Sequence, residues 1–413
     1  MPNTVQDSAG VLSDIPRTHL RRCVRHIIWK DFETHLGGSA LPATALKTLL
    51  SDEADGDDSL LKLGEDGVGL DSLAKISSAS AIARFFDMGR SGLDDHLLFS
   101  ETLSDWADIV WEHLRRTPKN SRRIVFETSG STDAPTLVPW RLTDLEKEVS
   151  TLTQCVFGDD IKRIVSLVPA KHIFGWQFTI ALPTALRCEV LDCVGRGMAS
   201  AIARLGEGDL IIATPFHWEA LLSAGIEFPD GVASVTSSAP MSDALWSRLT
   251  EAGLATLHEV FGATETGGIG WRSSPDLPFN LFPHLCRSGA TEVLGPAKKP
   301  LELQDHFSWQ SDTAFLPGSR LDKAIQIAGT NVSIKNVERV IEECPDVVSV
   351  AVRPAGGRLK AFIVPAQMPE DLDALERRIA SHVRKFLAPP ARPVRYDFGR
   401  DLPRNSIGKR TDW

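Results

Sequence analysis

Short apolar runs alternate with helical stretches from residue 123 to about residue 318, and this alternation constrains the fold more than any other feature of the chain. The clearest runs lie at residues 161–168, 188–193, 210–213 and 255–260. Strands interleaved with helices are typical of an α/β domain. We therefore expect an α/β core in the middle of the chain.

Composition limits the number of domains and the class of protein. A chain of 413 residues that is 42% hydrophobic can bury large cores and should form two or three domains. The net charge of −9 argues against a nucleic-acid partner, because such proteins usually present a basic face. No apolar run predicts a membrane span or a signal peptide, and the six cysteines show no CxxC pair or metal-site spacing. We expect a soluble, cytoplasmic protein with reduced thiols.

The sequence divides into three regions. Residues 1–118 are helical in pattern, residues 119–319 carry the α/β core, and residues 320–413 form a smaller unit with two predicted helices and a pair of strands. The basic segment at residues 115–123 is interpreted as a linker whose charges form a solvated face.

A hydroxyl-rich loop follows the apolar run at residues 123–126. Its hydroxyl residues surround one glycine, in the order Thr128, Ser129, Gly130, Ser131 and Thr132. Glycine lets the backbone approach a ligand closely, and hydroxyl and N–H groups together form a surface that suits phosphate oxygens. The loop lacks the Gly-Lys-Ser/Thr end of a Walker loop. Taken alone, such a segment is more often an ordinary loop than a phosphate site.

Downstream motifs change that balance. They lie at residues 260–270, 309–312, 320–322 and 402–409. Taken in order with the hydroxyl loop, they resemble the signature motifs of the adenylate-forming superfamily, which includes acyl-CoA synthetases, peptide-synthetase adenylation domains and luciferases. The resemblance covers residues 123–413. It implies a multidomain α/β adenylate-forming fold with a small, mobile α+β C-terminal domain.

The resemblance also implies a site for ATP and Mg²⁺. It assigns the hydroxyl loop to the β- and γ-phosphates and Glu265 to the metal, because a carboxylate oxygen suits an ion that bridges phosphates. Thr264 corresponds to the residue that contacts the α-phosphate, and Phe261 to the aromatic residue that stacks on adenine. Gly262 beside them favours close approach of the ligand, although Thr-Glu after a strand could also simply begin a helix.

Further nucleotide contacts follow from the same resemblance. Ser238 and Ala239 lie in a small-residue stretch that lines the adenine and acyl pockets, and Asp312 corresponds to the acid that binds both ribose hydroxyls. Arg320 matches an arginine near the ribose and phosphate. Asp322 and Lys323 fall at the hinge on which the C-terminal domain turns between its two working poses.

Lys409 is the expected catalytic cation. The resemblance assigns it to the bridge between the substrate carboxylate and the α-phosphate, where charge develops in the transition state. Two positions depart from the family pattern, since Asp133 stands where glycine is common and Thr136 where the loop usually has its lysine. Loss of that lysine removes a positive charge from the triphosphate site.

The sequence indicates the acid substrate less specifically than the nucleotide. Residues 169–176 resemble the segment at the gate of the acyl pocket, in which His172 is either the gate residue or a packed polar residue. The aromatic content of this segment fits a flat aryl carboxylate, and it would also fit an alkyl chain. The motifs are most similar to ligases of aryl polyene and xanthomonadin pigment pathways, which load 3- or 4-hydroxybenzoate-type starters onto an acyl carrier protein.

The N-terminal region has a resemblance of its own. Residues 69–73, Gly-Leu-Asp-Ser-Leu, look like the attachment site for 4'-phosphopantetheine in acyl carrier proteins, with Ser72 as the candidate serine. A serine at a helix N-terminus favours a phosphodiester there. The residues after Ser72 lack the acidic face of carriers, so Ser72 is either modified or only a helix N-cap.

Three functions remain open from the sequence. The first is an AMP-forming ligase that passes an aryl acyl group to a carrier-protein thiol, and the second is an acyl-CoA synthetase that uses free CoA. The third is a non-catalytic carrier-binding protein on a decayed synthetase fold. The presence of Glu265, Asp312 and Lys409 favours an enzyme.

Overall fold

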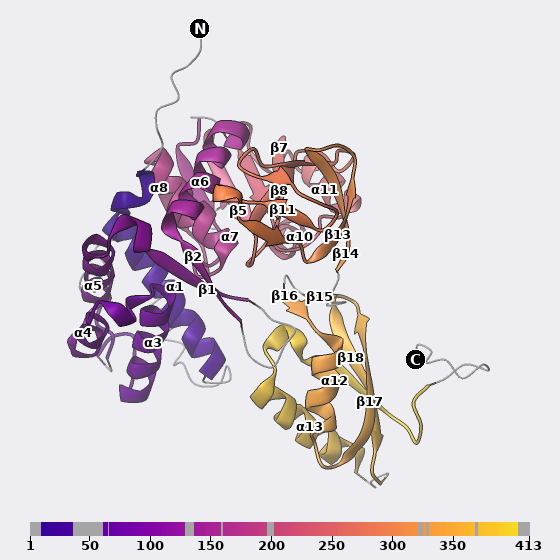
Figure 1. Cartoon of the computed structure of the whole chain (residues 1–413). Coiled ribbons are helices and arrows are strands. Elements are labelled where there is room, and N and C mark those ends of the chain that lie inside the picture. Colours follow the sequence, from indigo (N-terminus) through magenta and orange to yellow (C-terminus); the bar gives the residue numbers. More distant parts are fainter. Residues whose placement is uncertain are drawn as a thin grey trace. The chain divides into compact units, whose positions relative to one another are not determined.

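The computed structural model (Figure 1) describes the chain with several gaps. The described residues are 10–35, 61–64, 66–128, 136–157, 160–195, 202–320, 325–327, 330–367 and 371–403. They divide into two compact units, one within residues 10–128 and 137–318 and the other within residues 319–403. Each unit has its own hydrophobic core.

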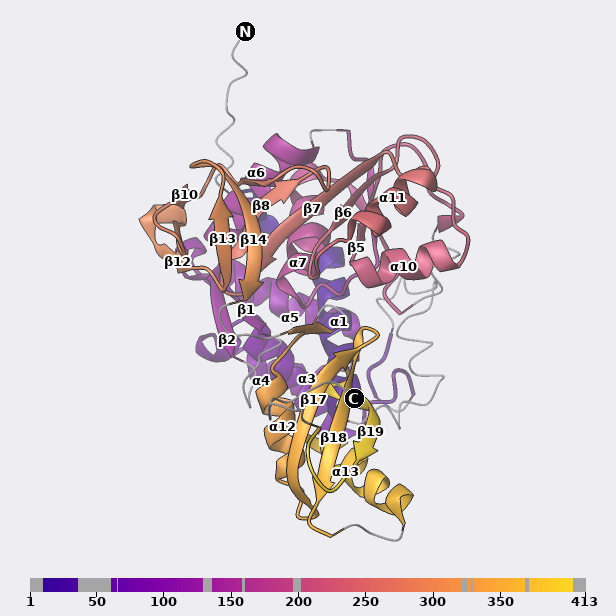
Figure 2. The same ribbon diagram turned by 90° about the vertical axis from the view of Figure 1, so that its right-hand side faces the viewer.

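The larger unit is built on one mixed sheet with the strand order β13-β14-β9-β8-β7-β6-β5-β3-β4 (Figure 2). Strands β4, β3, β5, β6 and β7 run parallel, and β8, β9 and β14 add antiparallel neighbours. Their bounds are β3 Arg163–Ser166, β4 Glu189–Asp192, β5 Asp209–Ala213, β6 Ala233–Thr236, β7 Thr256–Ala263, β8 Gly267–Arg272, β9 Phe279–Leu281, β13 Asp305–Trp309 and β14 Ala314–Arg320. Each apolar run singled out in the sequence forms one of these strands, so the α/β prediction is confirmed.

Both faces of this sheet are covered, and strand β5 shows how. Leu210 and Ile212 pack into the core with helices α6 (Leu142–Leu152) and α8 (Leu182–Leu186), whereas Ile211 packs into the core with α10 (Pro215–Ser223) and α11 (Asp243–Glu251). Alternate residues of a strand point to opposite faces. A strand between two helical layers is therefore apolar throughout, which explains its continuous hydrophobic run.

Helices of the N-terminal region pack against the start of the α/β core. They are α1 Arg17–His35, α3 Ser72–Phe85, α4 Asp94–Phe99 and α5 Leu103–Arg116, beside the antiparallel pair β1 Arg123–Glu127 and β2 Leu137–Arg141. An edge-to-face series of rings links the two regions, since Phe85 of α3 contacts Phe126 of β1 and Phe126 contacts Trp176 of α7 (Ile173–Trp176). One core cluster thus extends across residue 118.

Two sequence expectations for this region can be compared with the structure. The helical pattern expected for residues 1–118 is confirmed at α5, where Thr102 and Asp105 form a capping box and Trp106 lies on the buried side. The interpretation of Ser72 as an N-cap is wrong, because Asp71 is the N-cap and its carboxylate accepts the N–H of Ala74 at 2.8 Å. Ser72 is the exposed first residue of α3.

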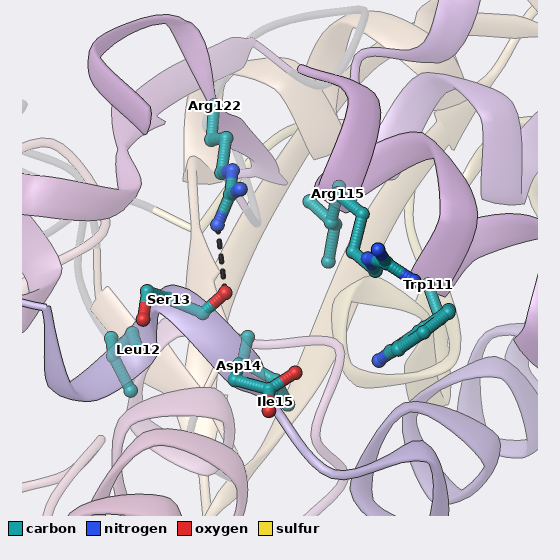
Figure 3. Close-up of a pocket in the computed structure, with 8 residues that line it drawn as sticks. Leu12, Ser13, Asp14, Ile15, Trp111, Arg115 and Arg122 are labelled. Atoms are coloured by element: carbon teal, nitrogen blue, oxygen red, sulfur yellow. Dashed lines mark hydrogen bonds between the residues drawn. The ribbon is translucent and has the colours of Figure 1, made fainter. Parts of the chain in front are cut away.

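The basic segment before β1 is not solvated at every position. Arg122 is buried and donates a hydrogen bond of 2.9 Å to the carbonyl oxygen of Ser13 (Figure 3). On the exposed side, the guanidinium groups of Arg17 and Arg115 lie over the ring of Trp111. The expected linker therefore has a structural contact at Arg122 that its charge pattern did not indicate.

The smaller unit contains a sheet in the order β17-β18-β19, covered by two helices that share its core. Its elements are β15 Ile325–Ile327, β16 Thr330–Val332, α12 Ile334–Glu342, β17 Val347–Ala355, β18 Arg358–Pro365, α13 Leu372–Phe386 and β19 Pro393–Phe398. The expected helices and strand pair are present. Strand β19 was not predicted; it is an edge strand in which arginine and aspartate alternate with apolar residues.

Short elements complete the described residues. The small sheet β10-β11-β12 comprises Cys286–Arg287, Glu292–Leu294 and Pro300–Glu302. The 3₁₀ turns are η1 Val11–Asp14, η4 Met88–Arg90, η5 Lys119–Ser121, η8 Pro296–Lys298 and η9 Pro389–Ala391, and the π-helical turns are η6 Thr153–Phe157 and η7 Gln177–Ala181. None of the described helices combines the length and the apolar character needed to cross a bilayer.

Glu148 of α6 packs directly onto the start of β8. A Cβ atom added at Gly267 or Gly268 would lie 2.7 or 2.8 Å from a carboxyl oxygen of Glu148, so only glycine admits this approach. Burial raises the pKa of Glu148 to about 7, although hydrogen bonds from Gly268 and Gln177 favour the charged form. Near neutral pH this buried carboxyl group is therefore partly protonated.

We predict that deletion of residues 1–118 leaves a chain that does not fold. The apolar faces of β1 and α7 would lose their cover, because these segments share one core with α1, α3 and α5. The measurement is expression of residues 119–413 followed by size-exclusion chromatography and thermal unfolding. A monomeric fragment with cooperative unfolding would show that the helices form a separate domain.

We also predict a pH-dependent difference in stability between the protein and Glu148→Gln. The folded-state pKa is raised, so the stabilising contribution of Glu148 is complete at low pH and is lost as pH rises through about 7. Glutamine is neutral throughout. Between pH 5 and pH 8 the protein should lose about 2 kcal/mol of unfolding free energy relative to the variant, as measured by urea denaturation. Two parallel stability curves would exclude titration of Glu148 in this range.

Candidate active site

The carboxyl ends of neighbouring parallel strands gather the site segments. The gate segment at residues 169–176 follows β3, the small-residue stretch at 237–240 follows β6, and the Thr264–Thr266 turn follows β7. These strands lie in the contiguous order β7-β6-β5-β3, so their carboxyl ends meet at one edge of the sheet. Ligands of open α/β sheets bind outside this edge.

The turn between β7 and β8 carries two predicted site residues, Thr264 and Glu265. Thr264 is half-buried and Glu265 is exposed. Thr266 closes the turn, because its hydroxyl group accepts the N–H of Ala263 at 3.2 Å and donates to the carbonyl oxygen of Gly267 at 3.1 Å. An exposed carboxylate on a fixed turn fits the role of an oxygen ligand for Mg²⁺ held between phosphates.

A second contact joins this turn to the β1–β2 pair. The indole Nε1 of Trp140 in β2 donates a 2.8 Å hydrogen bond to the carbonyl oxygen of Thr264. Strands β1 and β2 flank the hydroxyl loop, and Thr128 at its start is buried. The contact therefore ties the base of the loop to the turn that carries Glu265. Sequence reasoning missed Trp140; its place four residues after the loop was the available signal.

Gly262 has a structural reason as well as a possible binding role. A Cβ atom at this position would lie 2.2 Å from the carbonyl oxygen of Gly267 in the paired strand. The glycine is thus required by the hairpin itself. Its neighbour Phe261 is half-buried within an aromatic cluster, with ring centroids 5.5 Å from Phe307, 5.7 Å from Phe279 and 5.9 Å from Phe315. Phe261 is therefore packed in this cluster without being completely buried.

Ser238 adopts a backbone conformation that is uncommon for serine. Its φ is +74°, in the left-handed region, and the residue is exposed, whereas Ala239 is half-buried. Strained conformations of this kind cluster at binding sites. His217, after the adjacent strand β5, hydrogen-bonds Thr214 at 2.9 Å, and burial lowers the pKa of His217 to about 4. His217 is therefore a neutral polar group at the same sheet edge.

The gate segment is a tight turn that leads into α7. His172 is exposed and occupies the N-cap position of α7. Gly175 is required because a Cβ atom would lie 2.0 Å from the carbonyl oxygen of Pro169. The turn presents Phe174, half-buried, against Phe178 with a centroid separation of 5.1 Å. A histidine and an aromatic side chain thus lie at the carboxyl end of β3.

Asp312 lies in the turn between β13 and β14. Its side chain is 97% exposed and lies 3.7 Å from the guanidinium group of Arg287, which itself lies over the ring of Trp309. Sequence reasoning did not identify Arg287. A carboxylate with this exposure and one ion pair at 3.7 Å keeps acceptor positions for two hydroxyl donors.

Several predicted residues lie outside the part of the chain that the structure describes. They are Ser129, Gly130, Ser131 and Thr132 of the loop, the hinge residues Asp322 and Lys323, and the catalytic Lys409. Arg320 is the last residue of β14, and only its backbone is described. Their roles stay predictions.

Family models match both units. The model described as AMP-binding enzyme matches residues 87–288, and the model described as AMP-binding enzyme C-terminal domain matches residues 336–409. The second match ends at the predicted catalytic lysine. Together they cover strands β1 to β10 of the larger unit and most of the smaller unit.

Two bacterial relatives align over most of their length. A protein named 4-coumarate–CoA ligase from Rhodobacter capsulatus is 40% identical over 356 residues, which are 85% of this chain and 92% of the relative. One of the same name from Halorhodospira halophila is 34% identical, covering 84% of this chain and 89% of the relative.

Solved structures show the same fold at low identity. The o-succinylbenzoate CoA synthetase MenE from Bacillus subtilis superposes with a TM-score of 0.58 at 17% identity, covering 73% of this chain and 72% of that one. The amide bond synthetase McbA from Marinactinospora thermotolerans gives 0.56 at 20% identity, covering 69% and 67%. The chain therefore belongs to the AMP-binding family of adenylate-forming enzymes and is an ATP-dependent, AMP-forming ligase.

Proposed function

We propose that the enzyme activates a hydroxylated aryl carboxylic acid of the 4-coumarate class with ATP and transfers the acyl group to CoA. The observation that carries this proposal is the 40% identity to a 4-coumarate–CoA ligase over 92% of that relative's length. The aromatic pair Phe174–Phe178 beside His172 supports a flat ring in the acyl pocket.

The acceptor thiol is the point at which this proposal departs from the sequence analysis. Carrier-protein transfer ranked first there, and free CoA was the alternative. The named relatives are CoA ligases, which favours the alternative. The N-terminal helices that resembled a carrier share their core with β1 and α7, which gives them a structural role within the ligase.

The reaction has two steps. The acid carboxylate attacks the α-phosphorus of ATP and releases pyrophosphate, and the thiolate of CoA then attacks the carbonyl carbon of the acyl-adenylate and releases AMP. In the first step Glu265 would supply an oxygen ligand to Mg²⁺, which neutralises phosphate charge. The Thr264 hydroxyl would donate to an α-phosphate oxygen, and the hydroxyl loop would bind the leaving pyrophosphate.

Lys409 would stabilise charge on the α-phosphate and the attacking carboxylate. We predict that Lys409→Ala lowers the adenylation rate by about two orders of magnitude or more, because it removes a main electrostatic contribution to the transition state. Acid-dependent ATP–pyrophosphate exchange measures this step. Thioester formation from a supplied acyl-adenylate should change much less, and normal exchange in the variant would refute the assignment.

The substrate and acceptor are tested by two assays in series. ATP–pyrophosphate exchange is measured with 4-coumarate, 3-hydroxybenzoate, 4-hydroxybenzoate, octanoate and acetate, and we expect the aryl acids to give the highest kcat/KM. Thioester formation is then compared with CoA and with a phosphopantetheinylated acyl carrier protein. Preference for octanoate would refute the aryl specificity, and transfer to the carrier without transfer to CoA would restore the first sequence interpretation.

Intact mass after incubation with a phosphopantetheinyl transferase and CoA tests Ser72 separately. The exposed position of Ser72 makes the reaction sterically feasible. We expect no mass increase, because Asp71–Ser72 already has a structural role as the capped start of α3. An added phosphopantetheine mass that is lost in Ser72→Ala would show an attached carrier function.

A further inference from the structure

Helix α1 turns a strongly polar face toward the core of the larger unit. His19, Arg22, Arg25 and His26 are all buried, at spacings of three, four and seven residues that place them along one side of the helix. Burying such groups is costly unless each has a partner, so their contacts reveal what the helix is placed to hold. All of the contacts described below fall on the segments around the gate.

Asp192 at the end of β4 is the central partner. Asp192 is 2% exposed, and one of its carboxylate oxygens lies 2.5 Å from a guanidinium nitrogen of Arg25 and 2.8 Å from Nε2 of His26. The other oxygen accepts the N–H of Val194 at 3.1 Å. Both oxygens are therefore occupied by donors, which fixes the carboxylate and the imidazole ring against it.

His26 connects Asp192 to the gate segment. Its Nδ1 lies 2.9 Å from the backbone nitrogen of Ala170, which can only donate, so Nδ1 must accept. The proton of the neutral ring is then on Nε2, directed at Asp192. Burial lowers the pKa of His26, in agreement with a neutral ring whose nitrogens have opposite roles.

The contact point lies two residues before His172. Ala170 is fully buried and fixed by His26, whereas His172 is exposed at the N-cap of α7. The same face of α1 also holds the far end of this stretch: Arg22 donates to the carbonyl oxygen of Thr179 at 2.5 Å, and His19 hydrogen-bonds the Thr184 hydroxyl at 3.0 Å. Helix α1 thus holds residues 170–184 in place through hydrogen bonds at Ala170, Thr179 and Thr184.

We infer that His26, oriented by Asp192 and Arg25, is a positioning residue for the acyl-pocket gate: its bond to Ala170 fixes where His172 lies and so sets the affinity for the carboxylic acid. This inference rests on the proposed function in assigning the gate to the acid. His26 does not touch the substrate. It acts through the backbone at Ala170, and its described hydrogen bonds go to Asp192 and Ala170 and not to the predicted ATP residues Thr264 and Glu265.

Two substitutions of His26 separate its contacts. In His26→Asn the amide oxygen falls near the position of Nδ1, which keeps an acceptor for Ala170 and removes the contact to Asp192. In His26→Gln the amide reaches toward Asp192, and the acceptor for Ala170 is lost. We expect the KM for 4-coumarate to rise about tenfold in His26→Gln and to stay within about twofold in His26→Asn, with the KM for ATP unchanged in both.

His19→Gln is the matched control. His19 is a buried histidine of the same helix, but its bond goes to Thr184, twelve residues beyond His172. This variant should lower Tm without changing the KM for the acid. Equal acid KM values in His26→Gln and His26→Asn would overturn the inference, and so would a parallel rise in the KM values for acid and ATP, because a general loss of structure affects both.

Hydrogen exchange of the unaltered protein supplies a test that needs no variant and no substrate. The Ala170 amide should be protected to the level of the core strands, while the amide of His172, two residues later and with a longer bond of 3.4 Å to the carbonyl oxygen of Pro169, should exchange faster. An Ala170 amide that exchanges as fast as that of His172 would overturn the inference. If the wild-type enzyme shows no ATP–pyrophosphate exchange with any aryl acid, the proposed function fails. Hydrogen exchange at Ala170 still decides whether the bond from Ala170 to His26 holds this segment in place.

Discussion

A carboxylate at the carboxyl end of β4 determines how the N-terminal region must pack. Asp192 is almost completely buried, and an isolated charge there would cost several kcal/mol. Arg25 and His26 of α1 compensate it, so α1 has to dock in one register against the sheet. A buried ion pair is weak evidence for net stability, since an apolar replacement is often as stable, but it discriminates strongly against wrong packings. The helices before β1 are in this sense part of the ligase core rather than an addition to it.

The sheet explains why residues distant in sequence can serve one reaction. Parallel strands β3, β5, β6 and β7 end at a common edge, where the segments bearing His172, His217, Ser238 and Thr264 follow in turn. Beyond β7 the sheet becomes antiparallel, and this change is where the hairpin with Glu265 departs. Two contacts hold the hairpin from outside the sheet: Trp140 from β2 and Glu148 from α6. Each contacts a backbone group of the hairpin, so the surrounding fold positions Thr264 and Glu265.

Much of this arrangement could be predicted from apolar periodicity. Strand β5 and helix α5 follow from their hydrophobic patterns. A strand buried on both faces is a continuous apolar run, and a helix buried on one side has apolar residues at helical spacing. The role of α1 could not be predicted in this way. Histidine and arginine at helical spacing look like a solvated face, and their partner Asp192 lies more than 160 residues away. Polar pairing across such a separation leaves no periodic signal. Trp140 could not be predicted for the same reason: its indole N–H donates to a backbone carbonyl oxygen far away in the sequence, and every residue has such an oxygen.

The Asp-Ser-Leu triplet shows that local structure alone can explain why a short motif is present. Asp71 caps α3 through the N–H of Ala74, and Ser72 follows as the first helical residue, so the triplet is explained by helix initiation without any attached group. The glycines of the β7–β8 hairpin are likewise explained by close packing at Gly262, Gly267 and Gly268. The difference between the two motifs lies in their surroundings. Residues Thr264 and Glu265 project from the sheet edge at which other site segments converge, whereas α3 packs into a core shared with β1 and α7. Spatial convergence, which no single motif contains, is our reason for proposing a binding role for the β7–β8 turn and a structural role for the Asp-Ser-Leu triplet.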